Sequence, residues 1–119
     1  ITSDDLAETP LLLREEGSGT RSTVEAWLDD AGLTLVPPAA VLETTGIIRA
    51  NARAGIAPAV MSLRTVDTDL EDGALVRALL LGPPLIRPLR AIWSGRPGPA
   101  VTAFLDTARS SSTGGQISP

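Results

Sequence analysis

The feature that most constrains the fold is an apolar run followed by a Gly/Ser-rich turn and an amphipathic helical pattern. The run is Leu11–Leu13, the turn is Gly17–Thr20, and the helical pattern spans residues 20–31 with Gly32 as its stop. Apolar residues gather on one face of the expected helix, namely Val24, Trp27, Leu28 and Ala31. A buried strand, a turn and a helix are therefore expected in that order.

The turn itself favours binding of a small anion. Glycines let the backbone approach a ligand without a Cβ clash, and Ser18 and Thr20 add hydroxyl donors. The first N–H groups of a helix are unpaired and lie at the positive end of its dipole, so they attract negative charge. Arg21 adds a cation that can bind a carboxylate or phosphate through two hydrogen bonds. The alternative is a plain strand-to-helix connection with a Ser or Thr cap, since the spacing matches neither a Walker loop nor a dinucleotide fingerprint.

A second helix start rich in hydroxyls follows an extended segment at residues 39–43. Thr44-Thr45-Gly46 opens a pattern in which Ile47 and Ile48 are apolar, while Arg49 and Arg53 are expected on the solvated face. In parallel sheets, ligands lie beyond the carboxyl ends of the strands, next to helix N-termini. We therefore expect both helix starts to face one cleft. The candidate ligand-binding residues are Gly17, Ser18, Gly19, Thr20, Arg21, Thr44 and Thr45.

The rest of the chain continues the alternation of strands and helices. A capped helical turn is expected at residues 3–6, extended segments at 33–36, 56–61, 75–81 and 85–94, a helical turn within 67–73 and a helix at 99–109. Pro58 weakens its segment as a central strand because proline has no N–H. The last helix carries an apolar face formed by Val101, Phe104, Leu105 and Ala108. This alternation predicts an α/β fold with a largely parallel sheet.

Composition excludes several functions. The chain has no His and no Cys, so the commonest general base, thiolate nucleophile and metal ligands are missing, and we expect no catalytic residues, metal or cofactor. The acidic pairs Glu15-Glu16 and Asp29-Asp30 are better explained as solvated surface carboxylates than as a catalytic acid and base. The net charge of −4 argues against DNA binding by this chain itself. No apolar run has the length of a membrane span and no secretory signal is recognisable, so a cytoplasmic location is expected.

Several motifs resemble the effector-binding domain of LysR-type transcriptional regulators. The Arg-Glu-x-Gly-Ser-Gly-Thr-Arg run at residues 14–21 is the most specific of them. The resemblance continues through residues 5–7, 10–13, 43–49, 54–57, 70–76, 87–89, 92–93 and 103–106. The chain departs from the family pattern at Thr44-Thr45-Gly46, where Ser-Thr or Ser-Asn followed by Glu is usual, and at Pro58 and Ser62.

The resemblance implies a type 2 periplasmic-binding-protein fold, in which two α/β subdomains enclose an effector. It implies that residues 1–9 form a hinge or crossing segment and that residues 10–90 form the second subdomain. Residues 91–110 would be the returning strand and C-terminal helix of the first subdomain, and residues 111–119 a disordered tail. The implied partners are a small anionic or polar effector, further copies of the chain, and DNA through an N-terminal helix-turn-helix that this chain lacks. The alternative is a solute-binding protein of a transport system with the same fold.

Overall fold

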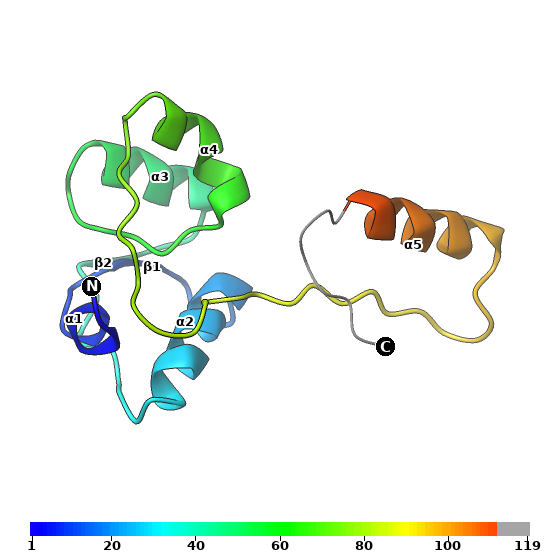
Figure 1. Ribbon diagram of the computed structural model, residues 1–119, viewed down its shortest axis with the longest axis horizontal. Helices are drawn as coiled ribbons and strands as arrows, with labels where there is room; N and C mark the ends of the chain where they lie inside the picture. Colours follow the sequence, from blue (N-terminus) through cyan, green and yellow to red (C-terminus); the bar gives the residue numbers. More distant parts are fainter. Residues whose placement is uncertain (112–119) are drawn as a thin grey trace. The chain divides into compact units, whose positions relative to one another are not determined.

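The computed structural model describes residues 1–111 and divides into two compact units, Ile1–Arg87 and Pro88–Pro119 (Figure 1). Residues 112–119, which make up most of the expected disordered tail, lie outside the described residues. Ser111 is the last residue of a helix, which corrects that expectation for this one position.

The sheet of the first unit contains two parallel strands, β1 (Leu12–Arg14) and β2 (Ala40–Leu42). Leu12 lies opposite Ala40, and Arg14 lies opposite Leu42. The expected strand at residues 56–61 is reduced to one parallel bridge between Leu12 and Ala59. The Leu12 N–H donates to the carbonyl of Pro58 over 2.8 Å. Pro58 has no N–H, so it cannot donate the hydrogen bond that would extend the pairing on the N-terminal side of this bridge.

Four helices surround these strands in the first unit. They are α1 (Ser3–Ala7), α2 (Gly19–Asp29), α3 (Thr45–Arg53) and α4 (Leu63–Glu71). In Figure 1, α1 and α2 lie on one side of the β1–β2 pair, and α3 and α4 lie on the other. The expected positions of α1, α2 and α3 are confirmed to within about two residues. The fourth helix begins earlier than expected, at Leu63, and Ser62 lies at its N-cap position without making a side-chain capping hydrogen bond.

The core of this unit forms between β1, α1 and α2. One cluster of buried side chains contains Leu6, Ala7, Leu11, Leu13, Val24 and Leu28. Leu12 is also buried, and because side chains alternate along a strand it faces the opposite side, where α3 contacts β1. The expected buried face of α2 is confirmed for Val24 and Leu28. It is wrong for Ala31, which is exposed because the helix ends at Asp29.

An ion-pair cluster joins α3 to α4. Asp69 has a side chain only 2% exposed and accepts hydrogen bonds from the Arg49 guanidinium, with Nη2–Oδ1 at 3.0 Å. Arg53 Nη1 lies 3.0 Å from the same carboxylate. The hydrogen bonds from Arg49, more than its charge, hold the pKa of Asp69 below its usual value. The expected exposure of these two side chains is confirmed, since Arg49 is 38% and Arg53 50% exposed, but the sequence analysis did not foresee that both pair with Asp69.

Three expected extended segments do not form strands within the described residues. Residues 33–36, 75–81 and 85–94 are apolar, but a strand also requires a neighbour with which to exchange hydrogen bonds. Residues 79–81 come nearest to pairing. The terminal amine of Ile1 donates to the Leu79 carbonyl, and the Leu81 N–H donates to the Ile1 carbonyl, each over 2.8 Å. Trp27 Nε1 donates to the Pro83 carbonyl at 3.2 Å and holds the next residues of this segment.

The second unit consists of an irregular segment followed by α5 (Pro99–Ser111). Pro99 opens the helix as predicted, since its fixed φ suits the first helical position. Phe104, on the expected apolar face, is 63% exposed. None of the helices described at residues 1–111 is long and apolar enough to span a bilayer.

Candidate ligand-binding site

The two hydroxyl-rich helix starts lie at the same edge of the sheet. Because β1 and β2 are parallel, both chains leave the sheet at its carboxyl edge before entering α2 and α3. Arg14, at the end of β1, joins the two starts. Its Nη1 donates to Thr45 Oγ1 at 3.1 Å, while Nε and Nη2 each donate to the Glu15 carboxylate at 2.8 Å. These hydrogen bonds also lower the pKa of Glu15.

The start of α2 has free hydrogen-bond donors. Gly17 has a φ of +84°, a conformation that favours glycine and turns the chain into the helix. Ser18 is the N-cap residue, but its side chain makes no capping hydrogen bond. The first helical bond is donated by the Ser22 N–H to the Ser18 carbonyl. The N–H groups of residues 19–21 consequently have no acceptor among the described residues, and they are available to a ligand.

The start of α3 differs because its threonines are already engaged. Thr44 Oγ1 accepts a hydrogen bond from the Ile47 N–H at 3.2 Å and so caps the helix. Thr45 Oγ1 accepts the hydrogen bond from Arg14. A hydroxyl that accepts one hydrogen bond keeps its own proton to donate. Both threonines can therefore still act as donors to a ligand oxygen.

Arg21 has partners that the sequence did not reveal. Its Nε lies 2.7 Å from Glu25 Oε1, and its Nη1 donates to the Arg14 carbonyl at 3.4 Å. The guanidinium is mostly enclosed, with 17% of the side chain exposed. The bond to Glu25 raises the pKa of Arg21, so the cation is stabilised inside the chain. The positive charge of Arg21 is therefore already paired with the carboxylate of Glu25.

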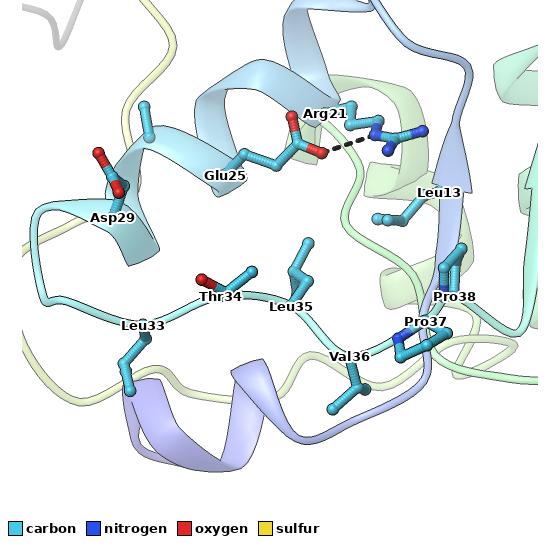
Figure 2. Close-up of a pocket in the computed structure, with 11 residues that line it drawn as sticks. Leu13, Arg21, Glu25, Asp29, Leu33, Thr34, Leu35, Val36, Pro37 and Pro38 are labelled. Atoms are coloured by element: carbon cyan, nitrogen blue, oxygen red, sulfur yellow. Dashed lines mark hydrogen bonds and ion pairs between the residues drawn. The ribbon is translucent and has the colours of Figure 1, made fainter.

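An open hollow of about 590 Å³ lies between α2 and the segment that leads into β2 (Figure 2). Its lining residues are Leu13, Arg21, Glu25, Ala26, Asp29, Leu33, Thr34, Leu35, Val36, Pro37 and Pro38. Of the candidate ligand-binding residues, Arg21 alone belongs to this lining. Figure 2 shows its guanidinium directed at Glu25 across the upper rim. The hollow and the start of α2 are thus separate features.

Arg87 is a residue near the start of α2 that the sequence analysis did not select. Its Nη1 donates to Thr20 Oγ1 at 3.3 Å, although 67 positions separate the two residues. The guanidinium also lies against Gly19, where an added Cβ would be 2.9 Å from Nη2 and 3.0 Å from both Cζ and Nε. No local sequence pattern signals this contact, because a long side chain brings it about from a distant segment.

Comparison with known proteins gives the family. Residues 1–112 match the model of the LysR substrate binding domain. An uncharacterised HTH-type transcriptional regulator of Mycobacterium tuberculosis is 36% identical, over 89% of this chain and 35% of its own length. The HTH-type transcriptional regulator CbbR of Xanthobacter flavus is 35% identical, over 77% of this chain and 28% of its own. A phosphonates import ATP-binding protein of Anaeromyxobacter dehalogenans is 36% identical, over 92% of this chain and 23% of its own.

The chain therefore belongs to the LysR substrate-binding-domain family, which confirms the resemblance found in its sequence. This family implies a type 2 periplasmic-binding-protein-like α/β fold, and the parallel β1–β2 pair with helices on both sides is consistent with it. The chain spans about a third of the length of the mycobacterial relative that it matches.

Proposed function

We propose that this chain is the effector-sensing part of a LysR-type transcriptional regulator and that it binds a small anionic or polar molecule at the starts of α2 and α3. The carrying observation is the set of unpaired N–H groups at residues 19–21, which lie at the same sheet edge as the start of α3. Membership of a family whose relatives are named transcriptional regulators supports the regulatory role.

The chemistry of the site follows from its donors. An oxygen of the effector accepts hydrogen bonds from the N–H groups at the start of α2, where the helix dipole favours negative charge. The hydroxyls of Ser18, Thr20, Thr44 and Thr45 add donors around the same ligand. Arg14 acts as a positioning residue, because its guanidinium donates hydrogen bonds to both Thr45 and Glu15 and so holds the two side chains in place.

The proposal extends to the protein of which this sequence forms part. Residues 1–9 form the crossing segment, residues 10–90 the second subdomain, and residues 91–110 the returning segment and last helix of the first. DNA is bound by a helix-turn-helix elsewhere in the regulator, and subunits associate as a homo-oligomer. Effector binding then shifts the arrangement of subunits by favouring one conformation over another. A solute-binding protein of a transport system is the second candidate, but the family model and the regulator relatives favour the first.

The site is tested by titrating sodium acetate and sodium sulfate into the ¹⁵N-labelled chain at constant ionic strength and following the amide signals. A ligand pocket normally encloses most of the ligand surface, and this chain supplies one side of the expected cleft. We therefore expect dissociation constants in the millimolar range for acetate and sulfate. The largest shifts are expected at residues 19–21, with smaller ones at residues 45–47.

Variants at the two helix starts locate the ligand. Thr20→Val and Thr44→Val should weaken binding, while Thr34→Val, at an exposed position in the segment before β2, should leave it unchanged. Shifts confined to residues 33–38 would instead place the ligand in the hollow beside α2 and would overturn the proposed site.

A further inference from the structure

Residues 79–87 cross the first unit without forming a helix or a strand, and we call them the strap. Figure 1 shows this stretch as a yellow-green trace that leads from the side of α4 to α2. Its apolar side chains are divided between two environments. Leu80 and Leu85 are partly buried against the core cluster, whereas Leu79 and Leu81 are 70% and 66% exposed. The strap therefore covers the core with only part of its apolar surface.

Two polar anchors hold the strap near its middle. The first is Ile1, whose nitrogen donates to the Leu79 carbonyl and whose carbonyl accepts from the Leu81 N–H, each over 2.8 Å. The second is the Trp27 indole, whose Nε1 donates to the Pro83 carbonyl at 3.2 Å. Both anchors join groups that are far apart in sequence, so neither persists once the strap moves away from the unit.

The middle of the strap cannot add a ladder of backbone hydrogen bonds. Pro83 and Pro84 have no N–H to donate. Gly82 has a φ of +120°, a conformation that L side chains rarely adopt. Among the described residues, the Leu81 N–H is the only one in the strap that donates to a backbone carbonyl. The strap is therefore held less firmly than the helices beneath it, in which successive residues add backbone hydrogen bonds.

We propose that the strap opens and closes as one segment while the rest of the first unit stays folded. A region with few buried contacts and few backbone hydrogen bonds opens at a lower free energy than the core. Only Gly82 separates Leu81 from Pro83, so the two anchors are released together. The opening involves no ligand, and it therefore stands or falls independently of the proposed ligand-binding site.

Opening changes how far the second unit can move. The strap is the chain connection that leads to Pro88, where the second unit begins. In the closed form the last residue of the strap is held at α2, because Arg87 Nη1 donates to Thr20 Oγ1 at 3.3 Å. A released and fully extended strap reaches about 30 Å. The closed strap thus fixes the point from which residues 88–111 leave the first unit, and the open strap frees that point.

Hydrogen exchange of the ¹⁵N-labelled chain, followed by NMR at increasing sub-denaturing urea concentrations, tests the strap. The Leu81 N–H and the Trp27 Nε1–H report on the two anchors, and the Val24 N–H, inside α2, reports on the core. Protection of the Leu81 N–H should be at least about tenfold relative to an unstructured peptide and at least about tenfold below that of Val24. Urea should speed exchange at Val24 much more than at Leu81, because local opening exposes little surface.

Gly82→Ala perturbs the strap alone. The new Cβ would lie 3.9 Å from Trp27 Cζ2, an ordinary contact, so the change acts through the backbone conformation at φ +120°. Exchange at the Leu81 N–H and the Trp27 Nε1–H should speed up by the same factor, at least about threefold. Complete loss of protection at both anchors, with Val24 still protected, would also support the proposal, since the strap would then be open in a folded unit.

Two changes in α3 are the controls, because α3 stays folded when the strap opens. Gly46→Ala is the same chemical change as Gly82→Ala, and it should slow exchange at Val24 by about two- to fivefold. Ile48→Val removes part of a buried side chain and should speed exchange at Val24 by about two- to tenfold. Neither variant should change exchange at Leu81 by more than about twofold, because local opening does not unfold α3.

Three outcomes would refute the strap. If the Leu81 N–H is as protected as that of Val24 and follows it in urea and in Ile48→Val, this segment opens only when the whole unit unfolds. If the Leu81 N–H exchanges like an unstructured peptide in the unaltered chain, the strap is not closed in solution. Unequal responses of Leu81 and Trp27 to Gly82→Ala would show that the two anchors open separately.

Discussion

Gly17→Ala and Gly46→Ala are the same chemical change beside the two helix starts, and the structure predicts opposite effects on stability. At neither position does a described atom lie within 4 Å of where the new Cβ would be, so packing does not contribute. Gly17 has a φ of +84°, which costs an L residue about 1–2 kcal/mol, partly offset by about 0.4–1 kcal/mol from a less flexible unfolded chain. Gly46 lies inside α3, where alanine is favoured by about 0.5–1 kcal/mol.

The expected result is a free energy of unfolding lowered by roughly 1 kcal/mol in Gly17→Ala and raised by up to about 1 kcal/mol in Gly46→Ala. Urea denaturation followed by tryptophan fluorescence measures both. A Trp93→Phe background makes Trp27, which packs against the core of the first unit, the reporter. A change of the same sign in both variants would refute the reasoning, because the backbone conformation would then not decide the outcome.

Three further predictions follow from burial, charge and composition. Leu28→Ala removes a side chain that is 0% exposed and should lower the free energy of unfolding in urea by about 2–5 kcal/mol, whereas a loss below about 1 kcal/mol would mean that the cluster is loosely packed. Because its pKa is lowered on folding, Asp69 contributes stability that is complete above the unfolded-state pKa and is lost as pH falls through the folded-state pKa. Asp69→Asn should therefore flatten the loss of stability below about pH 5, and a profile equal to that of the unaltered chain would contradict this. This acidic chain should show no duplex DNA binding at physiological salt, and a salt-sensitive anisotropy change at micromolar concentration would contradict that.

The elements that the sequence predicted well are those with local signals. Leu11–Leu13 followed by Gly17 and a helical pattern contains its own strand, turn and helix start, and all three form. The apolar residues at 75–81 and 85–94 suggested strands just as strongly. A strand depends on a neighbour that periodicity does not encode, and no such strand forms within the described residues.

The candidate site shows the same limit. Parallel topology was enough to predict that the starts of α2 and α3 share one sheet edge. It did not reveal that Arg21 is bound to Glu25, or that Arg49 reaches Asp69 across 20 positions. The approach of Arg87 to Thr20 was equally invisible. A long side chain can reach several partners. Which partner it binds depends on the distant segments that the folded backbone brings next to it.

The pairing of Ile1 with Leu79 and Leu81 has a consequence for how the first unit can be connected. The amine of Ile1 and the Leu79 carbonyl are 78 positions apart in sequence, yet they are joined by a hydrogen bond of 2.8 Å. Ile1 and residues 79–81, near the two ends of the first unit, therefore lie next to each other. A compact unit with adjoining ends tolerates circular permutation and insertion into a host loop. Joining residue 81 to Ile1 by a short glycine linker, and opening the chain at the exposed Gly32, should accordingly yield a permuted unit that still folds.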